Sequence, residues 1–223
     1  MAKTNLVHLF GMSIINRSTF FLFFFLYTVM LTSFAYADPA GWGLDTRVSF
    51  TPDQSLYSSS AVDANGNIHV VWEEQMGSNR EIFYKKLDNN GNALTGDLRL
   101  TNDLRLSQFP SLAVDPSGNV HVVWMDDRHG AFPGGDWAVH YTKLNNNGNI
   151  VIGDKPLTNW TDNVYEEYPS IAVDSNGFLH LAYADSRDDA AMYTDEIYYV
   201  KFTNNALPIT NEIRVSFNNT SNS

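Results

Sequence analysis

Aromatic, acidic and arginine side chains gather in three stretches of this chain, and they are residue types with which a protein could hold a polar ligand. The candidate ligand-binding residues are Asp126, Arg128, Trp137, Trp160, Glu166, Asp185, Arg187 and Tyr193. Aromatic rings beside carboxylates and guanidinium groups are typical of grooves that bind carbohydrate or peptide. The same residue types are also common in loops that bind nothing. We assign none of them a catalytic role, because spacing alone does not place two carboxylates around a substrate.

The arginines have a second interpretation. Arg128 follows Asp126 by two residues, and Arg187 follows Asp185 at the same spacing. A guanidinium group can hold a ligand carboxylate with two parallel hydrogen bonds, and it can hold a carboxylate of its own loop in the same way. Because the Asp-x-Arg pair recurs in successive repeats, we expect local pairing that braces each loop.

The repeat itself determines where these residues lie. The segments 61–72, 113–124 and 172–183 align without gaps, and in each a Gly stands three residues after an Asp, a His six after and a Trp or Tyr nine after. Further apolar and aromatic runs follow each segment, separated by turns rich in Asn and Gly. Short β-branched and aromatic runs between such turns predict consecutive antiparallel strands. Each copy therefore predicts a unit of four strands.

Within each copy, the Asp-x-x-Gly segment predicts a tight turn between the first two strands. The Asp carboxylate can accept backbone N–H groups inside the turn, and Gly supplies the positive φ that closes it. The histidines His69, His121 and His180 are zinc ligands by residue type. They occupy the same strand position in every copy, however, so the repeat holds them apart. We expect each to be buried and hydrogen-bonded.

Calcium is the cofactor that the Asn-rich turns could hold. The segments 63–67 and 88–92 place oxygen-bearing side chains two residues apart, as calcium loops do. Their Gly falls at the fourth position of the loop, whereas an EF-hand loop has it at the sixth. We therefore expect no metal site, with calcium in these turns as the alternative.

Tandem four-stranded units at this spacing predict an all-β fold of the β-propeller type. Blades are expected at about 51–101, 102–158 and 159–217, and the segment 46–50 matches the closing strand at 213–217, which adds one leading strand. Propellers usually close with four to eight blades. Three blades predict a partial or open propeller: a piece of a larger one, which we favour, or a chain that self-associates through open blade faces and edges.

Strand direction alternates within a blade, so the turns after the first and third strands share one rim. The other rim carries the longer, variable loops, and all eight candidate residues fall there. Function tends to reside in such loops on a rigid scaffold. We therefore expect the ligand at the second rim.

The repeat motif Pro-Ser-(Leu/Ile)-Ala-Val-Asp-x-x-Gly-x-x-His-(Val/Leu)-x-(Trp/Tyr), followed by Asp-x-Arg, resembles the sialidase-like propeller repeats of secreted microbial proteins. The resemblance covers about residues 47–217 and implies a propeller fold and an extracellular setting. It also makes Arg80, Arg128 and Arg187 candidates for the arginine cluster that grips the substrate carboxylate in sialidases. This sequence departs from the family in one respect: the sialidase Asp-box, Ser-x-Asp-x-Gly-x-Thr-Trp, is absent.

The first 37 residues differ from the rest. Lys3 and Arg17 are their only formal charges, and an apolar run at 20–34 precedes Ala35-Tyr36-Ala37. Such a run before a small-x-small site predicts a signal peptide at 1–37 and a secreted or cell-surface protein. An uncleaved membrane anchor is the alternative.

Charge and cysteine content limit the partners. Without residues 1–37 the chain has 12 basic and 25 acidic residues, which argues against nucleic acid and against membrane contact beyond the signal. The chain has no Cys, so core burial and strand pairing must hold it without disulfides.

We expect a glycan or an extracellular protein as the partner. The predicted function is a non-catalytic extracellular module that recognises such a partner or serves as a scaffold. Two alternatives remain open: a fragment of a sialidase-like glycoside hydrolase, and a structural cell-surface repeat protein.

Overall fold

The computed structural model describes residues 46–130, 136–159, 164–187 and 195–217. The signal peptide predicted at 1–37 lies outside these ranges. Within them the chain is built of strands, and no helix there is long and apolar enough to cross a membrane.

The strands form three antiparallel sheets of four strands each. The first sheet contains β1 (Ser55–Val62), β2 (Ile68–Met76), β3 (Asn79–Leu87) and β4 (Leu98–Arg99). The second contains β5 (Ser107–Val114), β6 (Val120–Asp126), β7 (Ala138–Leu144) and β8 (Ile150–Pro156). The third contains β9 (Glu166–Val173), β10 (Leu179–Asp185), β11 (Glu196–Phe202) and β12 (Ile213–Arg214).

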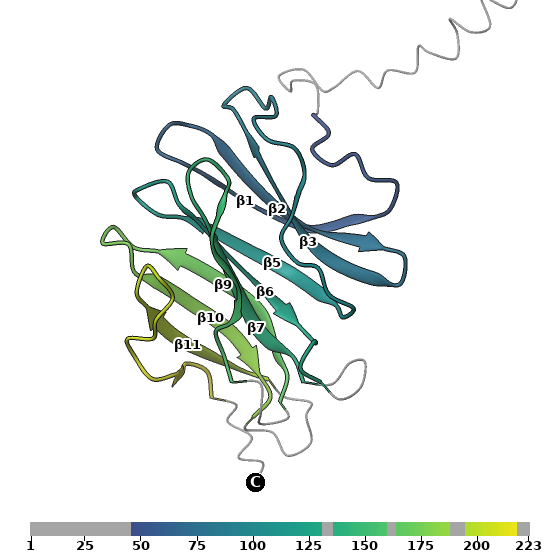
Figure 1. Cartoon of the computed structure of the whole chain (residues 1–223). Helices are drawn as coiled ribbons and strands as arrows, with labels where there is room; N and C mark the ends of the chain where they lie inside the picture. The colour runs from purple at the N-terminus through teal and green to yellow at the C-terminus, as the bar shows by residue number, and fades with distance from the viewer. Residues whose placement is uncertain (1–45, 131–135, 160–163, 188–194, 218–223) are drawn as a thin grey trace, which may run out of the picture. The chain divides into compact units, whose positions relative to one another are not determined.

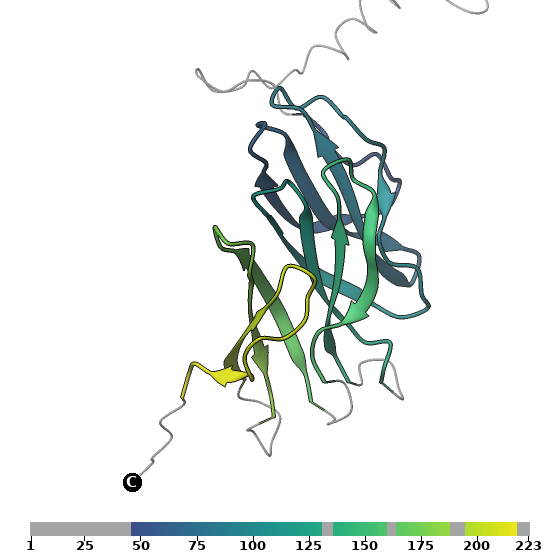
Figure 2. The ribbon, with the colours of Figure 1, turned by 60° about the vertical axis from the view of Figure 1, so that its left-hand side comes forward.

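Each sheet pairs its strands in chain order, as a propeller blade does (Figure 1). The first strands of the three sheets contact one another, β1 with β5 and β5 with β9. Turning the molecule shows the sheets following one another from the first to the third (Figure 2). The predicted fold class, an all-β partial propeller of three four-stranded blades, is confirmed.

The turns between the first two strands have the predicted chemistry. Asp63 Oδ1 accepts the backbone N–H groups of Asn65 and Asn67, both at 2.9 Å, and Asp115 and Asp174 accept the equivalent N–H groups in their blades. The glycine of each turn has φ between 80° and 83°. A side chain with a Cβ rarely adopts that conformation, which explains the glycine.

Apolar cores lie between successive blades. Tyr84 and Trp124 belong to the core between the first and second blades, and Tyr141 and Leu181 to the core between the second and third. All four side chains are fully buried. Because a strand alternates its side chains between two faces, the middle blade supplies residues to both cores. Burying one such side chain contributes about 1.5–3 kcal/mol.

The histidines are hydrogen-bonded within their own blades, as predicted; His69 and His121 are also buried as predicted, whereas His180 is 31% exposed. His121 Nδ1 lies 2.9 Å from the Tyr141 hydroxyl, and its Nε2 lies 3.3 Å from Asp115 Oδ2. His69 and His180 make the equivalent contacts in the other blades. Burial lowers the pKa of His121 to about 4. The ring is therefore neutral at pH 7, with Nε2–H donating to Asp115 and Nδ1 accepting from the tyrosine.

The segment 46–50 has the local geometry of a closing strand but pairs with no strand. Arg47 Nε donates to the carbonyl two residues further on at 2.6 Å, as Arg214 does beside β12 at 2.8 Å. A preceding blade that could pair with this segment is not among the described residues. Lys85 instead fixes it to the first blade by donating to the Val48 carbonyl at 2.8 Å.

Candidate functional site

Three aromatic side chains stand at the same position in the first strand of each blade. They are Tyr57 in β1, Phe109 in β5 and Tyr168 in β9. The ring centroids of Tyr57 and Phe109 are 4.4 Å apart, and those of Phe109 and Tyr168 are 4.9 Å apart. These are contact distances for tilted and edge-to-face aromatic pairs. The three rings, which we call the aromatic row, thus run from blade to blade along the innermost strands.

The aromatic row is open to solvent. Tyr57 is 52% exposed and Tyr168 is 57% exposed, whereas Tyr84 and Tyr141 of the cores are fully buried. Phe109, between the two tyrosines, is half-buried. The row therefore offers flat apolar ring surface that the fold does not use for its own core.

A β-bulge positions each ring. The pairing of β1 with β2 shifts register between Leu56 and Ser59, and the same shift occurs in the second and third blades. The ring-bearing residues Tyr57, Phe109 and Tyr168 have φ of 49°, 51° and 51°. This left-handed conformation costs a non-glycine residue about 1–2 kcal/mol. Glycine would adopt it without strain, yet the chain has an aromatic residue at all three places, and strain of this kind clusters at ligand sites.

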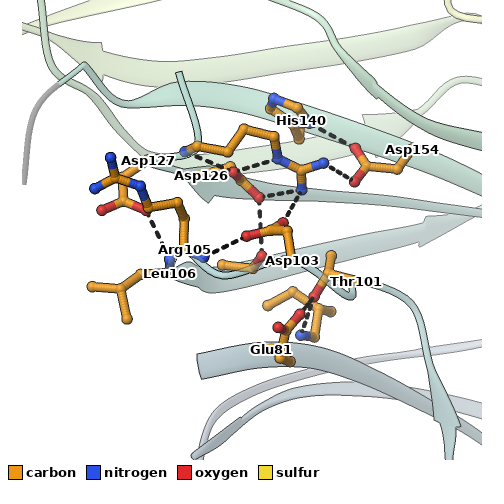
Figure 3. A network of polar contacts seen from close by, with 12 residues as sticks. Glu81, Thr101, Asp103, Arg105, Leu106, Asp126, Asp127, His140 and Asp154 are labelled. Atoms are coloured by element: carbon orange, nitrogen blue, oxygen red, sulfur yellow. Dashed lines mark hydrogen bonds and ion pairs between the residues drawn. The ribbon is translucent and has the colours of Figure 1, made fainter. Parts of the chain in front are cut away.

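The rim that carries the longer loops after the second and fourth strands is called the loop rim. In the second blade, Arg128 braces this rim. Its Nε and Nη2 each lie 2.6 Å from an oxygen of Asp126, its Nη1 lies 2.6 Å from Asp154, and Nη2 lies 2.9 Å from Asp103 (Figure 3). Burial alone would raise the pKa of Asp126, but the hydrogen bonds from Arg128 and the positive charge of its guanidinium group hold it below its usual value. The predicted local pairing of Asp126 with Arg128 is confirmed.

Arg187 repeats this arrangement in the third blade. Its Nε donates to Asp185 at 2.8 Å, its Nη1 donates to Glu212 at 2.5 Å, and its guanidinium carbon lies 4.4 Å from the centre of the Tyr198 ring. In the first blade Arg80 pairs with the buried Glu73 at 2.8 Å. Each guanidinium group that the sialidase resemblance proposed as a carboxylate clamp is therefore bonded to a carboxylate of this chain.

Glu166 breaks the pattern of the other two blades. It stands opposite Asp185 in the strand register, where the first two blades have Ser55 and Ser107 opposite an acid. Those serine hydroxyls donate to the opposing carboxylates, at 2.7 and 2.9 Å. In the third blade two acids face each other instead, and Glu166 is fully buried.

This environment makes Glu166 a weak acid. Burial, with the charges of Asp185 and Glu212 nearby, raises the pKa of Glu166 to about 8. Thr158 donates to its Oε2, and Arg187 lies 3.5 Å from its Oε1, an atom without a hydrogen-bond partner among the described residues. Glu166 consequently retains its proton at neutral pH.

Of the three remaining candidate residues, Trp137 lies within the described ranges and two lie outside them. Trp137 is 7% exposed, and its carbonyl accepts the Glu166 N–H at 3.3 Å. Trp160 and Tyr193 fall in ranges that the structure does not describe. Among the candidates that the structure describes, Asp126, Arg128, Asp185 and Arg187 are engaged in ion pairs with residues of their own blades. Their role in ligand binding stays a prediction.

Sequence reasoning missed the aromatic row. Each ring precedes a serine by two residues, at Ser59, Ser111 and Ser170, so the recurrence was visible in the alignment. The repeat signal begins four residues after each ring, at Ala61, Ala113 and Ala172, and the bulge that turns the ring to the surface leaves no turn signal such as Asn-Gly. An aromatic residue in a β-strand pattern ordinarily indicates core.

The described residues contain no cluster of three or more His, Asp or Glu side chains arranged to hold a metal ion. In the turn considered for calcium, Asp63 Oδ1 accepts two backbone N–H groups, and its Oδ2 accepts the Asn67 side-chain amide at 2.9 Å. Asp88 makes the same three bonds in its turn. Hydrogen-bond donors thus occupy the oxygens that a cation would need.

Comparison with known proteins agrees with the propeller fold. No protein-family model matches the sequence, and no curated protein matches it. Among solved structures, the chain is similar to an endo-arabinase from Bacteroides thetaiotaomicron, with a TM-score of 0.51 and 11% identity over 71% of this chain and 64% of that chain. It is also similar to Zg3597, a family 117 glycoside hydrolase from Zobellia galactanivorans, with a TM-score of 0.51 and 12% identity over 74% of this chain and 56% of that chain.

This chain thus spans less than two thirds of either structure. At these identities the similarity establishes the fold alone. That fold is a β-propeller of the kind found in glycoside hydrolases, and the two matches do not single out sialidases.

Proposed function

We propose that this chain is an extracellular propeller module that binds carbohydrate on its aromatic row and does not itself catalyse a reaction. The observation that carries the proposal is the row of contacting rings of Tyr57, Phe109 and Tyr168, of which both tyrosines are exposed, at strained backbone positions. Sugar rings present C–H groups on their faces, and these pack against the electron-rich face of an aromatic ring. A row of rings suits successive residues of a glycan chain.

Polar groups beside the row can take sugar hydroxyls. Glu167 precedes Tyr168 and is half-buried, and burial together with the charge of Asp195 raises its pKa. A few placed polar groups around an apolar surface are typical of sites that orient a ligand.

Two independent features support the setting. The fold is similar to that of two glycoside hydrolases, a class of enzymes that hold carbohydrate. The apolar run and small-x-small site in residues 1–37 favour export, so the module would be secreted or held at the cell surface. An extracellular glycan is therefore the ligand class we propose.

The acids of the loop rim favour binding over catalysis. A retaining glycosidase needs two carboxyl groups about 5–5.5 Å apart with the substrate between them. Asp126 and Asp185 are fully buried, and each is bonded to an arginine of its own loop. Neither is open to a sugar.

One observation favours a second candidate function, glycoside hydrolysis. Glu166, whose pKa is about 8, faces Asp185, and two acids whose environments separate their pKa values can act as acid and base. Fluorogenic arabinofuranosides and sialosides test this directly. Hydrolysis that is lost in Glu166→Gln would establish the enzyme, whereas a protein that binds glycan without hydrolysing these substrates would support the module.

The test of the binding proposal is a glycan array that includes arabinans and sialylated glycans, followed by affinity electrophoresis in the best-binding polysaccharide. Tyr168→Ala should weaken binding about tenfold or more, the equivalent of about 1.4 kcal/mol. The matched control is Leu104→Ala, since Leu104 is 97% exposed and lies between the first two blades in the connection to β5. Failure to bind any glycan, or equal binding by Tyr168→Ala and the wild type, would contradict the proposal.

A further inference from the structure

The outer face of the third blade is the surface that the other two blades bury. His69 and His121 point from this face toward the next blade, and their side chains are 0% exposed. The equivalent His180 is 31% exposed, and Ile197 on the same face is 41% exposed. In the part of the chain that the structure describes, this face is open.

The two covered faces show what contacts such a face makes. Lys86 Nζ donates to the carbonyl and the side-chain oxygen of Asn146 in the next blade, at 2.7 and 2.8 Å. Lys143 makes the same contacts with Asn204, one blade further on. A lysine in the third strand of one blade therefore fixes the Asn-rich turn of the next.

The innermost strands carry a second contact of this kind. The Leu112 N–H points to the Ser59 hydroxyl of the preceding blade, at 3.4 Å. The Ile171 N–H makes the same approach to Ser111, at 3.3 Å. Both blade junctions thus share a lysine–asparagine contact, a serine contact and one step of the aromatic row.

The open ends of the partial propeller carry complementary halves of all three contacts. The third blade has the donor Lys201, the acceptor Ser170 and the ring of Tyr168. The first blade has the counterparts, listed here by equivalent position: the turn residue Asn89, the backbone N–H of Ser60 and the ring of Tyr57. Among the described residues, Lys201 Nζ makes a long ion pair with Asp174, at 3.8 Å, and lies over the Phe178 ring.

We propose that two copies of this chain associate head to tail, so that the third blade of each covers the first blade of the other. Two identical junctions then close a ring with two-fold symmetry. The ring has six blades, within the range that propellers adopt. Tyr168 of one copy meets Tyr57 of the other, so the aromatic row becomes continuous. The association does not rest on the proposed carbohydrate binding.

Sequence near the two open ends agrees with this arrangement. Arg47-Val48-Ser49-Phe50 recurs as Arg214-Val215-Ser216-Phe217, and each arginine lies over the phenylalanine of its own segment, at 5.4 and 5.0 Å. In the third blade Arg214 pairs with Glu196 at 2.7 Å.

The experiment uses the absence of cysteine from the chain. Ser60 and Ser170 are exposed, so replacing them should leave each copy folded. In the proposed dimer, Ser60 of one copy and Ser170 of the other are equivalent to Leu112 and Ser59. The Leu112 backbone N lies 3.4 Å from Ser59 Oγ, so cysteines at the equivalent positions should come close enough to form a disulfide. Ser60→Cys combined with Ser170→Cys should give a covalent dimer on mild oxidation, whereas either single variant should not.

Light scattering of the purified wild type, without glycan, should give twice the mass of one chain. Lys201→Ala should weaken the association about tenfold. The mass of a single chain at every concentration would overturn the proposal, and so would equal cross-linking by the single-cysteine variants. Because no glycan is present, neither result depends on whether the aromatic row binds carbohydrate.

Discussion

The two rims of the blades repeat their residues for different reasons. The rim that carries the Asp-x-x-Gly turns is called the turn rim. On this side, each blade repeats an Asp, a His and a Tyr joined by hydrogen bonds, as Asp115, His121 and Tyr141 are in the second blade. At the loop rim, each blade repeats an aromatic residue that is exposed or half-buried and strained. Recurrence in every blade therefore does not by itself distinguish a structural residue from a functional one. The two sets of residues differ instead in burial and in backbone strain.

The sharpest way to break this comparison is to remove the acid of the turn rim. Asp115 accepts the N–H groups of Ser117 and Asn119 and the amides of Asn119 and Asn204, all at 2.8–2.9 Å. Asp115→Ala leaves these donors unpaired beside a buried His121, and we expect a loss of about 4 kcal/mol in the free energy of unfolding. Urea unfolding measures it.

The matched control is Asp88→Ala, because Asp88 makes the three bonds within its own turn that Asp115 makes, without the fourth, and its turn is exposed. Solvent can replace those bonds, so its loss should be much smaller. Equal losses for the two variants would show that the turn rim does not depend on burial.

At the loop rim, replacing Glu166, the buried acid of the third blade, should stabilise the fold at high pH, whereas replacing Asp115 destabilises it. An acid whose pKa is raised from 4.5 to about 8 keeps its proton in the folded state and releases it when unfolded. The unfolded state then binds fewer protons, so stability falls by a few kcal/mol as pH rises from about 5 to 8. Glu166→Gln removes this dependence and should be more stable than the wild type at pH 9. Parallel stability curves for the two proteins would refute this.

The acid limb of the stability curve should report the turn rim. Burial alone would raise the pKa of Asp115, but the hydrogen bonds from Asn119, Asn204 and His121 lower it to about 2. An acid with a lowered pKa stabilises the fold above its ordinary value and loses that contribution as pH falls toward 2. The loss should be about 2 kcal/mol. In Asp115→Asn, urea unfolding at pH 5 and pH 2.5 should lack that difference, and an unchanged difference would assign it to other acids.

Backbone strain at the aromatic row should give the smallest change in stability. It should also reverse the usual order of stability of alanine and glycine variants. In a strand, Ala is ordinarily more stable than Gly by about 0.5–1 kcal/mol. Because Tyr168 has φ of 51°, Tyr168→Gly should instead be more stable than Tyr168→Ala by about 1 kcal/mol. Both variants lack the ring, so the difference in melting temperature isolates the strain. The ordinary order would mean that the backbone relaxes when the ring is removed.

Much of the fold could be predicted from sequence because its signals are local. The Asp-x-x-Gly turns and the alternation of apolar residues predict the strands and their order. The length of β8 could not be predicted from the repeat, because the equivalent strands β4 and β12 have two residues each. In the second blade, β-branched residues from Ile150 onward extend the pairing of β8 with β7. The segment 46–50 resembles a closing strand in sequence, but pairing needs a neighbouring strand as well.

The site could be predicted less well, because it depends on register and burial. Asp126 and Asp185 have the residue type of a ligand site, and only the structure shows that arginines of their own loops bind them. Tyr57 has the residue type of a core, and only the bulge in β1 exposes it. Neither distinction is present in the identity of a residue or in its spacing along the chain.

The most direct test of the account measures stability and glycan affinity together in two tyrosine variants. Tyr141→Phe removes the hydroxyl that bonds to His121, and Tyr168→Ala removes an exposed ring of the aromatic row. We expect Tyr141→Phe to lose about 1 kcal/mol of stability and to bind glycan as the wild type does. We expect Tyr168→Ala to bind at least tenfold more weakly while remaining folded. Unchanged affinity in Tyr168→Ala, or weakened affinity in a folded Tyr141→Phe, would contradict the division between the two rims.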